Sequence, residues 1–264
     1  QMLTWLTFPA YVAIFSLLIY FIVYTHSGDY KLSGIAAAIF AVHPIQSESV
    51  NYISSRSELL MASFFLLACL AHIRFGRTGN WLWYGMAVVG GILALLVKSV
   101  AVVLVAVLIL CDWLLQDEKK WASQWKDYLV FVALNLVYIF STRQLVGKAL
   151  LEPVRGLDVQ FWTQIKALIY YTMLAVMPVK LSVEHQFFAA DWPGEGAVLG
   201  GGLVLLSLFI LFLYRAPGML RFAAAWWIIV LLPTLVVPLY VLVNEHRLYP
   251  VSYTHLTLPT IRLV

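Results

Sequence analysis

The chain has 264 residues, of which 62% are hydrophobic and 11% are charged, and its formal net charge is +4. Soluble domains carry roughly 25% charged residues, so this composition excludes an ordinary soluble protein. The positive charges are dispersed and form no basic stripe, so we expect no nucleic-acid partner. Apolar runs of about 17 to 25 residues recur, each long enough to cross a bilayer as a helix. We therefore predict an all-α, polytopic bundle of transmembrane helices.

Candidate membrane spans follow one another along the whole chain. In chain order they are 3–25, 32–44, 59–75, 81–97, 99–115, 127–142, 161–179, 197–214 and 222–243. The run from 81 to 113 would be about 50 Å long as a single helix, at about 1.5 Å per residue, which is too long for one crossing. Lys98 and Ser99 are therefore expected to mark a hairpin. The short segment 32–44 is expected to reach Pro44, where the chain leaves the hydrocarbon.

The loop charges indicate an orientation. Lysines and arginines gather in 74–77 and 119–126, and the positive-inside rule makes that side cytoplasmic. Nine full crossings would then place Arg215 and Arg221 outside, against the same rule. If 161–179 enters and returns, or lies partly at the interface, both arginines are inside, and we prefer this topology. It puts four polar groups on the outer face: 43–58, Lys98, 180–196 and 244–247.

These outer polar groups hold the candidate site residues. His43, Glu48 and Arg56 offer a base, a proton acceptor and an anion-binding fork. Lys98 either binds a phosphate as a point charge or snorkels to the headgroups. Two further acidic-histidine pairs follow later spans: Glu184 with His185, and Glu245 with His246, which Arg247 follows. The plainer interpretation of all of them is a rim of solvated charges.

The remaining polar and small residues have structural interpretations. They are a capping box at Ser55 and Glu58, a structural Asp112 balanced by Lys119 and Lys120, interfacial His26 and His72, small buried thiols at Cys69 and Cys111, and close helix packing at the glycines of 194–202. None of these residues is expected to take part in chemistry.

Four segments resemble, in the same order, motifs of one membrane-protein family. They are HPIQSESVNYISSRSELL at 43–60, LALLVKSVAVVLVAVLILCDWL at 93–114, LSVEHQF at 181–187 and LLPTLVVPLYVLVNEHRLYP at 231–250, called here the first to fourth motifs. They are similar to motifs of the transmembrane and tetratricopeptide-repeat protein O-mannosyltransferase family and its bacterial relatives. Ser47 stands where that family has Thr, Ser99 where Glu often follows the Lys, and Glu184 where Asp is usual. The change at Ser99 puts a charge role for that position in doubt.

The resemblance implies a GT-C glycosyltransferase fold. Residues 1–250 would be part of its membrane domain, truncated at both ends, and 251–264 looks like a non-native tail of artefactual sequence. The implied activity moves a mannose-like sugar from a polyprenyl-phosphate donor to a protein or other acceptor, on the periplasmic face of a bacterial inner membrane. The family's catalytic acidic residues are expected upstream of Gln1 and its repeats downstream, so the fragment alone is expected to be inactive.

The resemblance also suggests roles for the candidate residues. Arg56, Lys98 and Arg247 would bind the donor phosphate, and the supporting residues would be His43, Glu48, Glu184, His185, Glu245 and His246. A divalent metal, Mg²⁺ or Mn²⁺, is compatible with this chemistry, although the sequence supplies no complete ligand set. Two alternatives stay open. They are a transporter or flippase for a lipid-linked saccharide, and a non-catalytic membrane scaffold that carries tetratricopeptide repeats.

Overall fold

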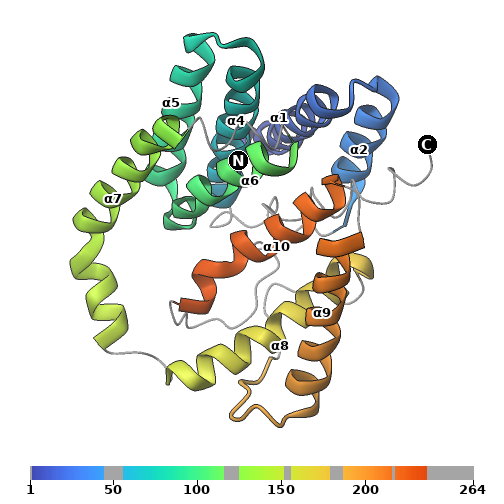
Figure 1. Cartoon of the computed structure of the whole chain (residues 1–264), viewed down its shortest axis with the longest axis vertical. Helices are drawn as coiled ribbons and strands as arrows, with labels where there is room; N and C mark the ends of the chain where they lie inside the picture. Colours follow the sequence, from blue (N-terminus) through green and yellow to red (C-terminus); the bar gives the residue numbers. More distant parts are fainter. Residues whose placement is uncertain are drawn as a thin grey trace.

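Figure 1 shows a computed structural model of the chain, which describes residues 2–44, 56–115, 125–151, 156–178, 187–215 and 218–236. Every regular element in these ranges is a helix. In order they are α1 (Met2–Ser27), α2 (Tyr30–Val42), α4 (Arg56–Thr78), α5 (Trp81–Val97), the 3₁₀ helix η2 (Ser99–Val103), α6 (Leu104–Leu115), α7 (Trp125–Leu151), α8 (Leu157–Val176), α9 (Gly196–Arg215) and α10 (Gly218–Val236). The all-α prediction is confirmed for the described residues, and each predicted apolar segment overlaps a helix there, although the ends of 161–179 and 222–243 lie outside the described residues.

Two short turns of the same kind join α1 to α2 and α4 to α5. In each turn a glycine adopts a left-handed backbone, Gly28 with φ +72° and Gly79 with φ +66°. The next residue caps the following helix: Asp29 accepts hydrogen bonds from two backbone N–H groups, and the Asn80 side chain accepts one. A glycine tolerates this backbone without the steric cost that other residues meet, and a capping side chain satisfies free helix donors. These turns therefore end one helix and start the next within two residues.

The hairpin of α4 and α5 is tightly packed because small residues face each other. A Cβ added at Gly90 would lie 3.1 Å from the carbonyl oxygen of Phe64 and 3.2 Å from the Cβ of Ala68. Helix α4 also contacts α1 and α6, and its Phe65 ring meets Trp226 of α10 edge to face, with the ring centroids 5.5 Å apart. Helix α4 is thus the central helix of the first half of the chain.

The reversal predicted at Lys98 is confirmed. Lys98 has an extended backbone, and η2 follows it before α6 begins. At the opposite end, the Tyr84 hydroxyl of α5 donates to the backbone oxygen of Asp127 at 2.9 Å, and the neighbouring Tyr128 hydroxyl donates to Asp112 of α6. The start of α5 and the end of α6 therefore lie together. The predicted helix 99–115 differs in one respect, because its first turn is 3₁₀.

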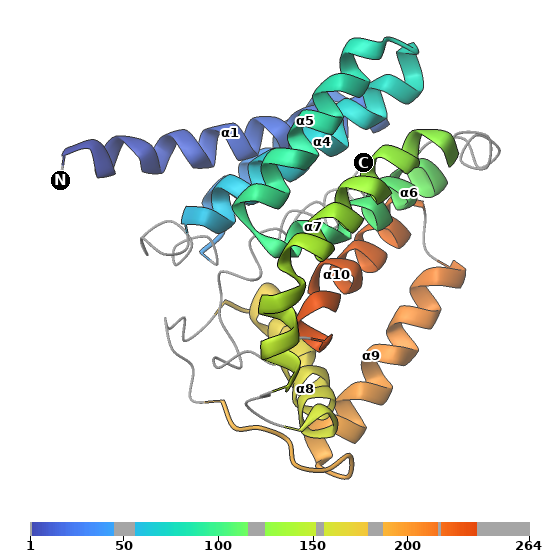
Figure 2. The ribbon, with the colours of Figure 1, turned by 90° about the vertical axis from the view of Figure 1, so that its left-hand side faces the viewer.

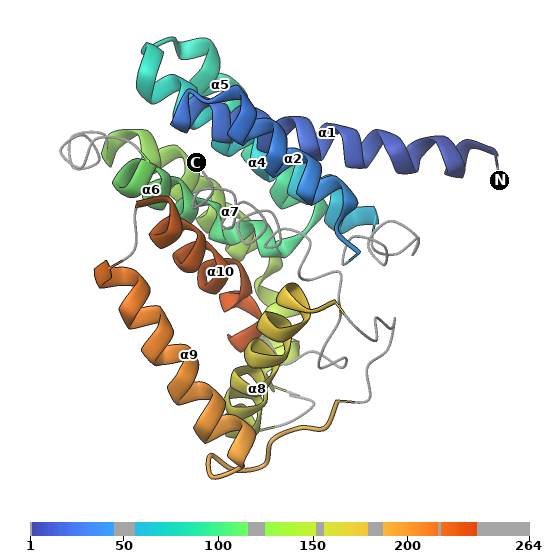
Figure 3. The ribbon, with the colours of Figure 1, turned by 90° about the vertical axis from the view of Figure 1, so that its right-hand side faces the viewer.

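The second half of the chain packs around α10. Figures 2 and 3 show α10 between α6 and the pair of α8 and α9, and α10 contacts all three of these helices and η2. Gly201 and Gly202 let α9 approach α8, since an added Cβ would lie 2.4 Å and 3.2 Å from the side chains of Ile169 and Ile165. Close packing at these two glycines is confirmed. Helix α8 is unbroken, so the prediction that 161–179 turns back within the membrane is wrong, while an interfacial position stays a prediction.

One helix in the described part of the chain is long and apolar enough, by length and composition, to cross a membrane. It is Ser57–Thr78 in α4, with a mean hydropathy of 1.8. Tyr30–Val42, Trp81–Val97, Ser99–Leu114 and other described apolar helices are shorter. The expected extension of 32–44 to Pro44 is not seen, because α2 ends at Val42. Spanning by the other helices stays a prediction.

Candidate functional site

The first and second motifs are joined by an ion pair between Glu58 and Lys98. Glu58 is the third residue of α4, and Lys98 directly follows Val97, the last residue of α5. The Glu58 side chain is 5% exposed and that of Lys98 is 31% exposed. A nearly buried carboxyl group needs such a partner, because desolvation without compensation is costly. The Lys98 side chain is thus paired with Glu58 and still partly exposed.

The ion pair changes the interpretation of both Lys98 and Glu58. Lys98 is not the isolated charge that was expected to snorkel, since its amine is held by a carboxyl group from another helix. Glu58 does occupy the third position of α4, which a capping box requires. Ser55, the other half of that box, lies outside the described residues. The carboxyl group of Glu58 therefore has a tertiary partner in addition to any local role.

The first motif is also joined to the helix that precedes the third. His43 follows the last residue of α2 and hydrogen-bonds the backbone of Ala175, next to the last residue of α8. Partial burial lowers the pKa of His43 below its ordinary value, and the hydrogen bond to Ala175 raises it by less. Burial disfavours the charged imidazolium, so the neutral ring is favoured. A neutral imidazole near the chain's polar segments can take up or supply a proton.

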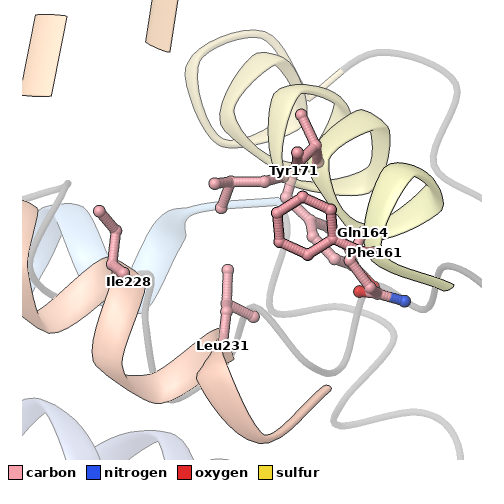
Figure 4. A pocket seen from close by; sticks show the side chains of 7 residues that line it. Phe161, Gln164, Tyr171, Ile228 and Leu231 are labelled. Atoms are coloured by element: carbon pink, nitrogen blue, oxygen red, sulfur yellow. The ribbon is translucent and has the colours of Figure 1, made fainter. Parts of the chain in front are cut away.

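The fourth motif begins within α10. Its first residue, Leu231, lines a pocket of about 110 Å³ together with Tyr171 of α8, and Figure 4 shows the two side chains on opposite walls. Helix α10 also contacts η2 and α6, which belong to the second motif. Contacts of the described residues thus link the first, second and fourth motifs, or the helices that carry them, and join the first motif to α8, the helix that precedes the third.

A second polar cluster lies at the opposite end of α4 and α6. His72 Nε2 is 2.7 Å from Asp112 Oδ2, and the Tyr128 hydroxyl donates to the same oxygen. His72 is 2% exposed and Asp112 is 1% exposed. The interfacial interpretation of His72 is therefore wrong, because a carboxyl partner allows its ring to be buried. Asp112 is structural as expected, but its partners here are His72 and Tyr128, and Lys119 and Lys120 lie outside the described residues.

Sequence reasoning missed how this cluster is assembled. Cys69 and Cys111 are buried and free, as predicted. Their thiols are in hydrogen-bonding contact with each other, and both cysteines lie within one turn of the pair of His72 and Asp112. His72 Nδ1 has no hydrogen-bond partner within the described part of the chain. The available signal was an Asp and a His inside long apolar runs, since such residues are rarely buried unless they are paired.

A third polar contact was also missed. The ammonium of Lys166 in α8 lies 2.5 Å from a carboxyl oxygen of Glu195, just before α9, and donates to the backbone oxygen of Phe188 at 3.3 Å. A single lysine within the apolar run of α8 was the signal for it. The contact fixes the chain that leads into α9.

Other predicted site residues are not placed by the structure. Glu48, Glu184, His185, Glu245, His246 and Arg247 lie outside the described residues. Arg56 is the first residue of α4, and its side chain is not described either. In the described ranges no group of three or more His, Cys, Asp or Glu residues is arranged to hold a metal ion. The role of Mg²⁺ or Mn²⁺ stays a prediction.

Comparison with known proteins gives short local similarities. Over 60 residues, or 22% of this chain, the sequence is 43% identical to the human (Homo sapiens) Protein O-mannosyl-transferase TMTC3, and the match covers 7% of that protein. Over 46 residues, or 17% of this chain, it is 48% identical to the mouse (Mus musculus) protein of the same name, of which 5% is covered. No family model matches the chain. No solved structure matches it. The similarity is consistent with a glycosyltransferase-like function, and with the one long apolar helix it suggests membrane association.

Proposed function

We propose that the protein to which this chain belongs is a multi-pass GT-C-type glycosyltransferase. It transfers a mannose-like sugar from a polyprenyl-phosphate donor to a protein acceptor on the periplasmic face of a bacterial inner membrane. The observation that carries the proposal is the joining of the first and second motifs by Glu58 and Lys98. The contact of His43 with Ala175 and the local similarity to Protein O-mannosyl-transferase TMTC3 support it.

The chemistry requires positive charge beside the departing lipid phosphate. Lys98 supplies it in this proposal, with Glu58 holding the amine near the end of α5 while about a third of the side chain stays exposed. Arg56 and Arg247 are the further proposed phosphate ligands, and His43 is a proposed hydrogen-bond donor. The acceptor hydroxyl also needs a carboxylate base. We assign the role of this base to none of the residues that the structure describes.

A transporter for a lipid-linked saccharide is the second candidate. The observation in its favour is the buried pair of His72 and Asp112 inside apolar helices, because buried ionisable groups often mark a transport path. This pair is fastened to Tyr128, however, and the ion pair that joins the motifs, Glu58 with Lys98, lies at helix ends. The arrangement favours the transferase.

The deciding experiment uses the full-length protein in lipid bilayers with a radiolabelled polyprenyl-phosphate mannose. We expect sugar transfer to an acceptor protein, and a loss of about 100-fold or more in kcat/KM for Lys98→Gln, as when a charge-stabilising donor is removed. Lys98→Arg should retain part of the activity. Lys31→Gln, at an exposed lysine in the first turn of α2, is the matched control and should be unaffected.

Three outcomes would contradict the proposal in different ways. Full activity in Lys98→Gln, Arg56→Ala and Arg247→Ala would show that the phosphate residues are wrongly assigned. Movement of the intact lipid-linked saccharide across the bilayer without transfer would establish the transporter. Neither transfer nor movement, with the protein still folded, would favour the scaffold. Thermal unfolding of each variant separates loss of function from loss of the fold, since Lys98→Gln leaves the Glu58 carboxyl group without this partner.

A further inference from the structure

We propose that the pocket between α8, α9 and α10 binds the apolar chain of a prenyl phosphate. This inference rests on the proposed function, because it names the place where the chain of the lipid donor lies. The pocket has a volume of about 580 Å³, which is in the range of about 300 to 1,000 Å³ that ligand sites occupy.

The lining of the pocket selects an apolar ligand. Every lining residue is aliphatic, aromatic, proline or glycine, among them Trp162, Leu203, Leu206 and Phe209. A hydrocarbon chain gains from leaving water for such a site, whereas a phosphate or a sugar would lose its hydration without compensation. The pocket therefore fits the chain of an amphipathic lipid and excludes its head.

The pocket opens sideways through the surface of α9. Leu199, Leu203 and Leu206 line it and are nevertheless 51%, 58% and 54% exposed. A contiguous apolar surface of this kind marks a contact with lipid, ligand or protein. An apolar chain in a bilayer can enter from this side without crossing a polar layer.

The inner end of the pocket leads toward the motifs. It shares Phe161, Ile165, Leu168 and Ile228 with the smaller pocket, which Tyr171 and the fourth-motif residue Leu231 also line (Figure 4). One turn beyond Tyr171 on α8, Ala175 hydrogen-bonds His43 of the first motif. A single chain that enters at α9 thus has its head directed to the motif segments. This continuity favours a prenyl phosphate, which has one chain, over a bilayer phospholipid, which has two.

A glycine pair supplies a matched test of the pocket. Gly202 lines it, so a leucine side chain at this position would occupy the space; its Cβ would lie 3.2 Å from Ile165 Cγ2, in close contact with α8. Gly200 lies two residues earlier on α9, and a Cβ there meets no atom within 4 Å. Gly202→Leu should therefore block the pocket, and Gly200→Leu should not. Leu206→Trp is a second filling variant, in case Gly202→Leu fails to fold.

The experiment labels the full-length protein in bilayers with farnesyl phosphate that carries a diazirine at the end of its chain. We expect labelled peptides from α9 and from the facing part of α8, competed by unlabelled farnesyl phosphate. Labelling should fall at least tenfold in Gly202→Leu and Leu206→Trp and stay within twofold of wild type in Gly200→Leu. Thermal unfolding confirms that each compared variant is folded.

Several results would overturn the inference. Unchanged labelling in both folded filling variants would show that the chain binds elsewhere. A second outcome is that a diazirine phosphatidylglycerol labels α9 equally and is not displaced by farnesyl phosphate. This result would assign the pocket to bilayer lipid. If neither probe labelled α9, another part of the protein would have to cover the pocket. Pocket labelling without sugar transfer would refute the proposed function alone, and transfer without pocket labelling would refute only this inference.

Discussion

Replacing Asp112 by leucine should destabilise the protein more than any single change at its surface. Leucine is similar in size but cannot accept a hydrogen bond. The substitution leaves two buried donors, His72 Nε2 and the Tyr128 hydroxyl, without the oxygen that both now use. All three residues are at most 7% exposed, so water cannot take the place of the carboxyl group without an opening of α4, α6 and α7.

The expected loss follows from these two contacts. A buried donor without a partner costs about 1 to 3 kcal/mol, and removing one member of a buried ionisable pair costs about 3 to 5 kcal/mol. We therefore expect Asp112→Leu to lower the free energy of unfolding by about 3 to 5 kcal/mol. Asp112→Asn keeps one acceptor oxygen and should lose only about 1 kcal/mol.

The assay is reversible denaturant unfolding in detergent, followed by tryptophan fluorescence. The control is Asp191→Leu at an exposed aspartate, which should change the free energy of unfolding by at most about 0.5 kcal/mol. In the double variant of Asp112→Leu and His72→Leu, the losses should fall short of additivity by about 0.5 to 3 kcal/mol. A loss below about 1 kcal/mol for Asp112→Leu, or strict additivity in the cycle, would show that the pair is not a buried interaction.

Three further predictions concern packing, a backbone contact and pH. Gly90→Ala should lower the free energy of unfolding by about 1 to 3 kcal/mol, because the added Cβ meets the backbone of α4. In Gly85→Ala the added Cβ meets nothing within 4 Å, so this variant should raise the free energy of unfolding by up to about 1 kcal/mol. The denaturant midpoints of the two variants test both expectations. Asn135→Ala removes the donor to the Val102 carbonyl at 2.8 Å and should cost about 1 kcal/mol in the same assay, and an unchanged midpoint would refute it. Burial lowers the pKa of His43, so the unfolded chain binds its proton more readily than the folded one, and the free energy of unfolding should fall as pH drops below about 6.5. His43→Gln should make this fall smaller. If the variant and the wild type had the same pH profile, His43 would not be the source of the fall.

The helices could be predicted from the sequence because their signals are local. Long apolar runs are separated by residues that stop and restart helices, such as Gly79 and Asn80, and the predicted segment 81–97 coincides with α5. The 3₁₀ start of the next segment could not be predicted. Its residues Ser99–Val103 are small and apolar and suit either kind of helix. The observed backbone depends on tertiary contacts, those of Lys98 with α4 and of Val102 with α7.

The candidate site could be predicted only in part. The motif patterns marked Lys98 and His43 as candidates, but not their partners. A partner such as Glu58 lies 40 positions away and has a local capping role that explains it equally well. The pair of His72 and Asp112 was missed for a related reason. Each residue taken alone is a polar group near a helix end, and only their contact shows why both can be buried.

The position of α10 has a consequence for how the protein is made. The hairpins α1–α2 and α4–α5 join helices that are neighbours in sequence, so they can form soon after synthesis, while the contacts of α10 with α6 and η2 join distant parts of the chain. Such non-local contacts form late, because closing a long loop costs entropy before any packing is gained. Until α10 docks, Phe65 lacks the ring of Trp226, and the second and fourth motifs remain apart. The arrangement that links the motifs is therefore among the last features of the described fold to be assembled.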